Sequence, residues 1–146
     1  MEKQLLISVS PYVQKYYINE TFKDLPEDIK ETLRAKLAVI AEKTHAIISL
    51  GFSEQMEIYI EYQYEDLSYS DEIGMGLRLK QFQRDEAELL KAIRTWYMIY
   101  HTPNGEIVRD IIILRQQGKS NDEIKESLLA KHGEEFADFL DILLED

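Results

Sequence analysis

The segments AIISLGF at residues 46–52 and QMEIYIEYQY at residues 55–64 decide the fold. In the second segment an apolar or aromatic side chain recurs at every second position, a period typical of a strand with one buried face. The two segments therefore predict a β-hairpin in an antiparallel sheet that has helices on a single side. One face of the second strand carries Met56, Ile58, Ile60, Tyr62 and Tyr64, and the other carries Glu57, Tyr59 and Glu61.

A long helix is expected before the hairpin. Pro26 suits the first helical position, and Glu27 and Asp28 follow where the helix dipole favours acidic side chains. Apolar residues then recur at three- and four-residue steps to about residue 44, which indicates a helix with one stripe facing the core.

The segment after Pro11 allows two interpretations. Aromatic and β-branched residues favour a strand at about 14–18. The alternative is a helix with Ser10 as its N-cap and Pro11 in its first turn. We favour the strand.

Residues 71–80 are also ambiguous. Their apolar residues alternate as in a strand, and Gly74 and Gly76 disfavour a helix. Acidic residues at 71 and 72 could instead open a helix that includes Ile73, Leu77 and Phe82. We favour the helix, followed by a firmer helical stretch over 85–100 with Leu89, Ile93, Trp96 and Tyr100 on one face.

The sequence TPNG at residues 102–105 predicts a boundary, since proline, asparagine and glycine all interrupt regular structure. We expect an α+β domain over 1–102 and a C-terminal helical appendage of three short helices over 103–146. The appendage has too few residues to fold alone, so it should pack on the first part or on another copy of the chain. Self-association is predicted through Phe136, Phe139, Leu140 and Leu143.

The predicted fold class is thus a mostly helical α+β fold. A three- to four-stranded antiparallel sheet, or its hairpin alone, is covered on one face by helices over 26–44 and 71–100. The C-terminal appendage completes it.

Composition narrows the range of functions. The net charge is −11, with 28 acidic against 17 basic residues. Binding to nucleic acid or to an anionic membrane requires basic side chains, so neither is expected as a direct ligand. The chain has no cysteine, which removes disulfides, thiolate catalysis and cysteine metal sites and fits a cytoplasmic protein. The sequence shows neither a signal peptide nor a membrane span.

Catalytic motifs are not evident. There is no Gly-x-Ser-x-Gly segment, and His45, His101 and His132 each fall at the end of a predicted helix, where an imidazole is favourable near the C-terminal dipole. The single Gly-x-Gly, at residues 74–76, lacks the third glycine and the βαβ unit of a dinucleotide site. We therefore predict no cofactor and lean towards a protein that is not an enzyme.

Charge distribution carries the main functional signal. No lysine or arginine occurs between Lys43 and Arg78, an interval that holds seven acidic residues and several tyrosines. An acidic surface can serve solubility alone. The functional alternative, which we take as the leading functional hypothesis, is a surface that docks a basic protein partner, because tyrosines give large contact area and acidic groups steer cations. The predicted docking residues are Tyr59, Glu61, Tyr62, Glu65, Asp66, Tyr69, Asp71 and Glu72.

Two alternatives remain open. Glu65, Asp66, Asp71 and Glu72 form a set of hard oxygen ligands that could hold a divalent metal in a hydrolase or transferase, although their spacing matches no EF-hand. The other alternative is an acidic nucleic-acid mimic that occupies the DNA site of another protein.

Motifs over about residues 8–101 suggest a family resemblance. The segments QKYYINE at 14–20, LPEDIK at 25–30, YSDEIG at 69–74 and LKQFQR at 79–84 resemble an uncharacterised bacterial family of the Firmicutes, known as a domain of unknown function. The resemblance implies no activity. The chain after Asn104 extends beyond that pattern.

The appendage has two weaker resemblances. Residues 114–124 resemble the first half of a helix-turn-helix unit, but the helix that follows is acidic and would be repelled by phosphates. Continued to residue 133, the segment also resembles the helical hairpin of a cytochrome c maturation thiol oxidoreductase, whose cysteine pair this chain lacks. Each resemblance implies a helical hairpin without its chemistry.

Overall fold

The computed structural model describes residues 3–12, 15–102 and 105–144, and the chain divides into two compact units, 1–94 and 95–146. The strands are β1 (Gln4–Ser10), β2 (Lys15–Ile18), β3 (Ile47–Phe52) and β4 (Ile58–Gln63). The helices are α1 (Glu27–Thr44), α2 (Glu72–Asp85), α3 (Ala87–His101), α4 (Gly105–Gln116), α5 (Asn121–His132) and α6 (Ala137–Leu143), with short 3-10 turns η1 (Glu20–Phe22), η2 (Leu67–Tyr69) and η3 (Glu134–Phe136).

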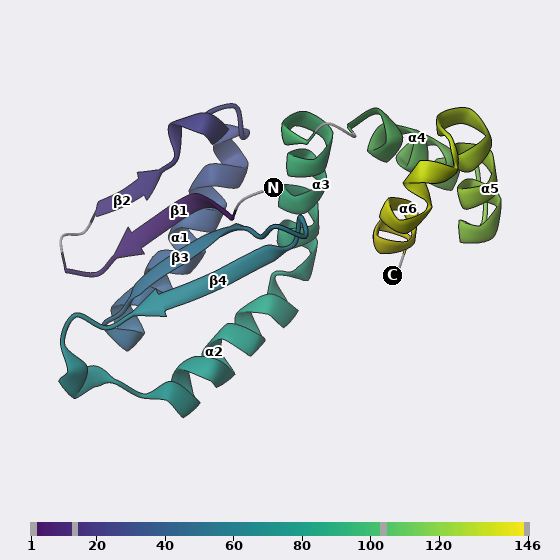
Figure 1. The fold of residues 1–146 in the computed structure, drawn as a ribbon. Helices are drawn as coiled ribbons and strands as arrows, with labels where there is room; N and C mark the ends of the chain where they lie inside the picture. The colour runs from purple at the N-terminus through teal and green to yellow at the C-terminus, as the bar shows by residue number, and fades with distance from the viewer. Residues whose placement is uncertain (1–2, 13–14, 103–104, 145–146) are drawn as a thin grey trace. The chain divides into compact units, whose positions relative to one another are not determined.

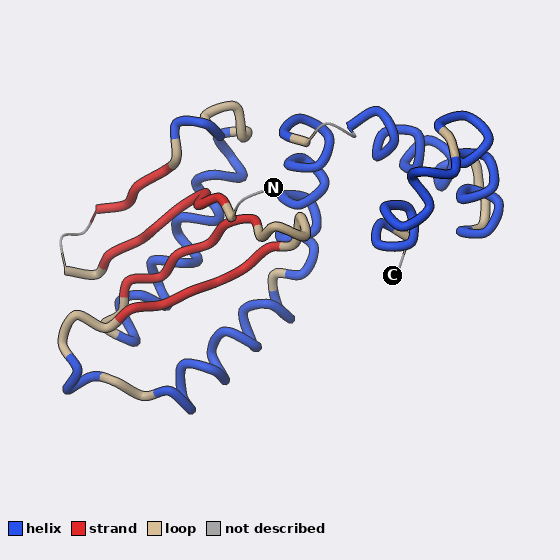
Figure 2. The backbone as a smooth tube through the Cα atoms, in the orientation of Figure 1, coloured by secondary structure: helices blue, strands red, loops and turns tan. Residues whose placement is uncertain are grey.

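The four strands form one antiparallel sheet in the order β2-β1-β3-β4 (Figures 1 and 2). β3 and β4 pair with Ile48 opposite Tyr62 and Leu50 opposite Ile60. Since paired residues point to the same face, the alternating side chains of β4 continue the apolar face of β3. The predicted hairpin is confirmed, but its second strand begins at Ile58, since Met56 lies in the turn with a left-handed φ of 62°. The strand predicted at about 14–18 is confirmed over Lys15–Ile18, and residue 14 lies outside the described residues.

One face of the sheet packs against α1, which lies behind the strands in Figure 1. The buried side chains of this layer are Ile7 and Val9 from β1, Ile48, Leu50 and Phe52 from β3, and Leu33, Leu37, Ile40 and Ala41 from α1. α1 fits its prediction closely, except that Pro26 is the N-cap residue and not the first helical residue. This apolar layer is what the alternation of the hairpin and the stripe of the helix anticipated.

The opposite face of β3 and β4 carries a polar cluster. The ring of Tyr59 covers Gly51, and Lys3 Nζ lies 4.3 Å from the centroid of that ring while also bonding to Glu61. Burial raises the pKa of Tyr59. The cluster therefore covers the backbone at Gly51 with polar and aromatic groups on this face of the sheet.

The helical interpretation of residues 71–80 is confirmed by α2, but its expected apolar face was wrong in part. Met75 and Phe82 are buried, whereas Ile73 and Leu77 are exposed. Residues three and four apart share a helix face, so Ile73 and Leu77 form a second, outward-facing apolar pair.

The helical stretch expected over 71–100 is interrupted at Glu86, whose φ of −109° and ψ of 26° separate α2 from α3. The Glu86 carboxylate pairs with Lys36 of α1 at 2.9 Å. Within α3, Tyr97 is buried and Tyr100 is exposed, which corrects the predicted inclusion of Tyr100 in the apolar face. In the last turns of α3 the buried face passes through Trp96 and Tyr97, which leaves Tyr100 outside it.

The C-terminal unit has an apolar core of its own. Ser120 caps α5 through a capping box with Glu123, as its spacing predicted. The core comprises Ile107, Ile111, Ile124, Leu128, Leu140 and Leu144, with Leu114, Leu129, Phe136, Phe139 and Leu143 packed against it. None of the helices that the structure describes combines the length and the apolarity needed to cross a membrane.

Candidate functional site

The eight predicted docking residues fall into two groups. Tyr59 and Glu61 lie on the open face of the sheet, where Lys3 engages both. The other six lie on the opposite side of β4 or in the segment that joins β4 to α2. Strand alternation separates the groups, because Tyr62 shares the face of Ile48 and neighbouring residues point the other way.

Local hydrogen bonds order the segment between β4 and α2. The carboxylate of Asp66 accepts from the backbone N–H and the hydroxyl of Ser68, at 3.0 and 2.7 Å. The Ser68 hydroxyl and backbone N–H hold the pKa of Asp66 below its usual value. Asp71 is the N-cap of α2, and its Oδ1 accepts from the Gly74 N–H at 2.9 Å. Two of the predicted carboxylates are therefore N-caps, Asp66 of the 3-10 turn η2 and Asp71 of the helix α2.

Two tyrosines of β4 hold this segment to the sheet. The Tyr62 hydroxyl donates to the Glu72 carboxylate, and that hydrogen bond raises the pKa of Tyr62. The Tyr64 hydroxyl lies 3.3 Å from both the backbone N and the carbonyl O of Asp71. Both hydroxyls bond to residues of the same chain, so these partly buried tyrosines offer less free contact area than the sequence suggested.

Tyr69 stacks on His45, with ring centroids 3.9 Å apart and planes inclined by 16°. His45 ends α1 in the left-handed conformation, with φ of 55°, and its carbonyl accepts a hydrogen bond from the Tyr12 hydroxyl. The predicted placement of His45 at a helix end is confirmed. Its ring serves to anchor Tyr69.

This site exposes aliphatic side chains beside its acidic residues. Residues 65–73 are all exposed, with Leu67 at 78% and Ile73 at 81%, and Leu77 follows at 65%. We define the candidate docking surface, called the docking surface below, as Glu65, Asp66, Leu67, Tyr69, Asp71, Glu72, Ile73 and Leu77. Leu67, Ile73 and Leu77 were not selected from the sequence, since apolar residues are normally assigned to a core.

The acidic residues of the basic-free interval mostly have partners in the fold. Glu57 pairs with Arg94 at 3.3 Å, and Glu61 pairs with Lys3. Within the described residues, Glu54 and Glu65 form no hydrogen bond or ion pair through their carboxylates. No group of three or more metal-ligating side chains occurs in the part of the chain that the structure describes, so the geometry gives the metal hypothesis no support.

A cationic site was not anticipated. Lys43 and Arg78, which bound the basic-free interval in the sequence, line the same pocket together with Tyr64, Tyr69 and Asp71. Both also line a groove of about 390 Å³ between α1 and α2. The fold thus brings together two cations 35 positions apart in the sequence, which no local pattern could indicate.

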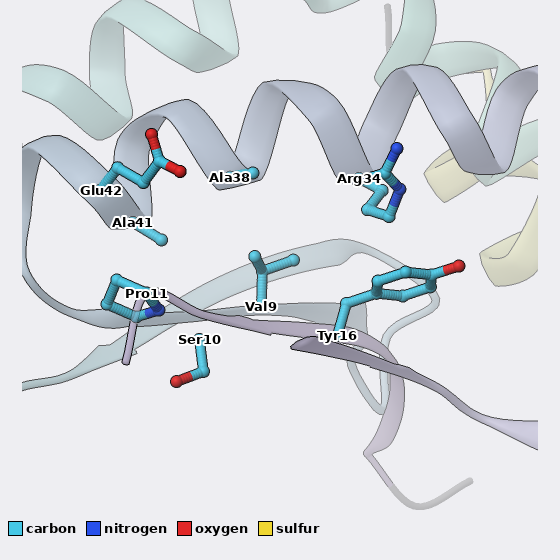
Figure 3. Close-up of a pocket in the computed structure, with 8 residues that line it drawn as sticks. All are labelled: Val9, Ser10, Pro11, Tyr16, Arg34, Ala38, Ala41 and Glu42. Atoms are coloured by element: carbon cyan, nitrogen blue, oxygen red, sulfur yellow. The ribbon is translucent and has the colours of Figure 1, made fainter. Parts of the chain in front are cut away.

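A separate cavity of about 270 Å³ lies between α1 and the first two strands (Figure 3). Arg34 pairs there with Glu31 at 2.8 Å and lies over the ring of Tyr16, while its Nε is buried without a hydrogen-bond partner. None of the eight described lining residues is a histidine, so no hydroxyl–imidazole pair for nucleophilic catalysis is assembled. They are Val9, Ser10, Pro11, Tyr16, Arg34, Ala38, Ala41 and Glu42.

The residues predicted to mediate self-association lie in or against the core of the C-terminal unit. Leu140 is fully buried, and Phe136, Phe139 and Leu143 pack partly buried around it. Their apolar area is thus largely used within the unit. Self-association through them stays a prediction.

Fold and site together define a mixed α+β domain with a one-sided antiparallel sheet, an ordered acidic segment and a helical C-terminal unit. The chain belongs to a family of unknown function, DUF6145, whose model matches residues 3–106. This confirms the resemblance found in the motifs of residues 8–101, and most of the C-terminal unit lies beyond the matched region. No significant match was found among curated proteins or among solved structures.

Proposed function

We propose that the protein is a non-enzymatic interaction module that binds a partner protein through the docking surface. The observation that carries the proposal is the pair of aliphatic side chains on α2, Ile73 and Leu77, which face outward at 81% and 65% exposure beside an ordered acidic segment. Exposed apolar groups bordered by polar ones are characteristic of protein contact sites.

Order in the segment supports a binding role. The caps at Asp66 and Asp71 and the bond between Tyr62 and Glu72 fix the backbone around the exposed side chains. A preordered surface loses less conformational entropy on association than a flexible loop does. Its acidic groups favour a partner that presents basic residues around an apolar contact.

Site-specific photo-crosslinking tests the proposal. A photoreactive residue is placed at Ile73 and, as a matched control, at Ile113, which is half exposed on α4 in the other unit. We expect a discrete protein adduct in cells of the source organism from position 73 and none from position 113.

Two further variants examine the chemistry of the contact. Leu77→Ser should lower the adduct yield by removing apolar contact. Glu65→Lys should lower it most at low salt, because steering between exposed charges is screened as ionic strength rises. Glu65 suits this test because its carboxylate holds no partner among the described residues. Equal adducts from positions 73 and 113, or an unchanged yield with Leu77→Ser, would contradict the proposal.

A further inference from the structure

The groove between α1 and α2 is lined by both apolar and charged side chains. Val39, Ile40 and Phe82 give it apolar lining, and Val39 is half exposed. At one end Lys36 and Glu86 neutralise each other at 2.9 Å. Lys43 and Arg78 line the groove as well, and they extend into the next pocket near the start of α2.

Lys43 and Arg78 give the other end of the groove a positive charge that no acidic residue of the described chain pairs with. Neither side chain makes an ion pair with any residue that the structure describes. Asp71 lines the pocket that they share near α2, and its Oδ1 accepts a hydrogen bond from the Gly74 N–H. Asp85 also lines the groove, and its Oδ1 accepts a hydrogen bond from Gln81 Nε2 at 2.7 Å. Like charges brought together are unfavourable unless an opposite charge joins them, and here they meet in a chain with a net charge of −11.

We propose that this groove binds a small amphipathic anion, a carboxylate with an unbranched apolar chain. The carboxylate lies between Lys43 and Arg78, and the chain follows the lining of Val39, Ile40 and Phe82. A guanidinium and an ammonium are the groups that bind carboxylates most strongly. At about 390 Å³ the groove falls within the usual size of ligand sites, about 300–1,000 Å³.

Groove length sets the length of the ligand. Lys36 and Lys43 are seven residues apart on α1, which corresponds to roughly 10 Å along a helix at about 1.5 Å per residue. A chain of about eight carbons spans that length. The charged pair of Lys36 and Glu86 closes the far end and disfavours a longer apolar chain. The residues that line the groove are not part of the docking surface, although Lys43 and Arg78 also line the adjoining pocket with Tyr69 and Asp71. This inference does not depend on the proposed function.

Calorimetric titration of the full chain with three probes tests the inference. Octanoate carries head and chain, acetate carries the head alone, and octanol carries the chain alone. We expect saturable binding of octanoate, at least about tenfold tighter than that of either other probe, because both parts of the groove contribute. In amide NMR spectra, the signals that move should belong to residues 36–43 and 78–86.

Variants separate the charge contribution from folding. Lys43→Gln with Arg78→Gln should reduce octanoate to the affinity of octanol, while Lys91→Gln, an exposed cation on α3, should leave it unchanged. Thermal melts of each variant report whether the fold is intact. Equal affinity for octanol and octanoate, full affinity in the double variant, or no saturable octanoate binding would each overturn the inference.

Discussion

Tyr59 lies directly over Gly51 on the open face of the sheet: a Cβ built on Gly51 would lie 2.6 Å from the Tyr59 hydroxyl oxygen and 2.2 Å from the Gln4 carbonyl oxygen. The glycine is therefore required by close approach, and its backbone needs no unusual conformation. Because one of the two obstacles is backbone, a side-chain rotation of Tyr59 cannot relieve the overlap.

Gly51→Ala should lower the free energy of unfolding by about 1–3 kcal/mol, the usual cost of an overpacked interior. Urea denaturation followed by circular dichroism measures it. Gly76→Ala is the matched control, since nothing lies within 4 Å of the added methyl and alanine favours a helix interior by about 0.5–1 kcal/mol. A Gly51→Ala variant as stable as the wild type would show that the strands separate freely at this point.

The N-cap of α2 gives a second prediction. Asp71→Ala should destabilise the protein by about 1 kcal/mol because the Gly74 N–H loses its acceptor, whereas Asp71→Asn should cost only a few tenths. Chemical denaturation compares both with Glu65→Ala, which removes an exposed carboxylate from the same segment. If Glu65→Ala were the most damaging of the three, the assigned cap would be incorrect.

The third prediction concerns pH and the C-terminal unit. Asp110 accepts from Lys131 at 2.9 Å and lies 3.0 Å from His132 Nε2, and these partners, Lys131 foremost, hold the pKa of Asp110 below its usual value. Asp110 is thus charged to lower pH in the folded chain than in the unfolded chain. Its stabilising contribution is complete well above the unfolded pKa of about 3.9 and is lost as the pH falls through that value towards the lower folded pKa.

Asp110→Asn should therefore flatten the acid limb of stability against pH between about pH 5 and pH 2. Thermal unfolding followed through the amide signals of α4 and α5 measures this. Glu126→Gln, on α5, serves as the control and should keep the wild-type slope. An unaltered slope in Asp110→Asn would mean that other carboxylates govern the acid limb.

A fourth prediction distinguishes the two groups of predicted docking residues. Tyr59→Ala combined with Glu61→Lys alters the open face of the sheet and leaves the docking surface intact. We expect the adduct formed from position 73 to persist in this variant, while Leu67→Ser should reduce it. If the Tyr59 and Glu61 variant lost the adduct at an unchanged melting temperature, the partner would contact the open face of the sheet instead.

Local pattern was sufficient for most of the secondary structure. The alternation in residues 55–64 identified a half-buried strand, the spacing of Ser120 and Glu123 identified a capping box, and both are present. These features depend on neighbours within about four residues, so sequence alone can report them. The orientation of α2 could not be found in this way, because Gly74, Gly76 and the break at Glu86 leave several helical phases equally plausible.

The sequence by itself determined the mixed α+β class, the hairpin, the extent of α1 and the acidity of the interval between Lys43 and Arg78. Each is a matter of residue order and hydrophobic period. Tertiary structure decided which of those residues are available. In the folded chain, Tyr59, Tyr62 and Tyr64 contact other residues of the same chain. Ile73 and Leu77 face outward. Lys43 and Arg78 line one groove. The physical reason is that exposure and charge pairing depend on contacts between distant segments, and these exist only after the helices pack on the sheet.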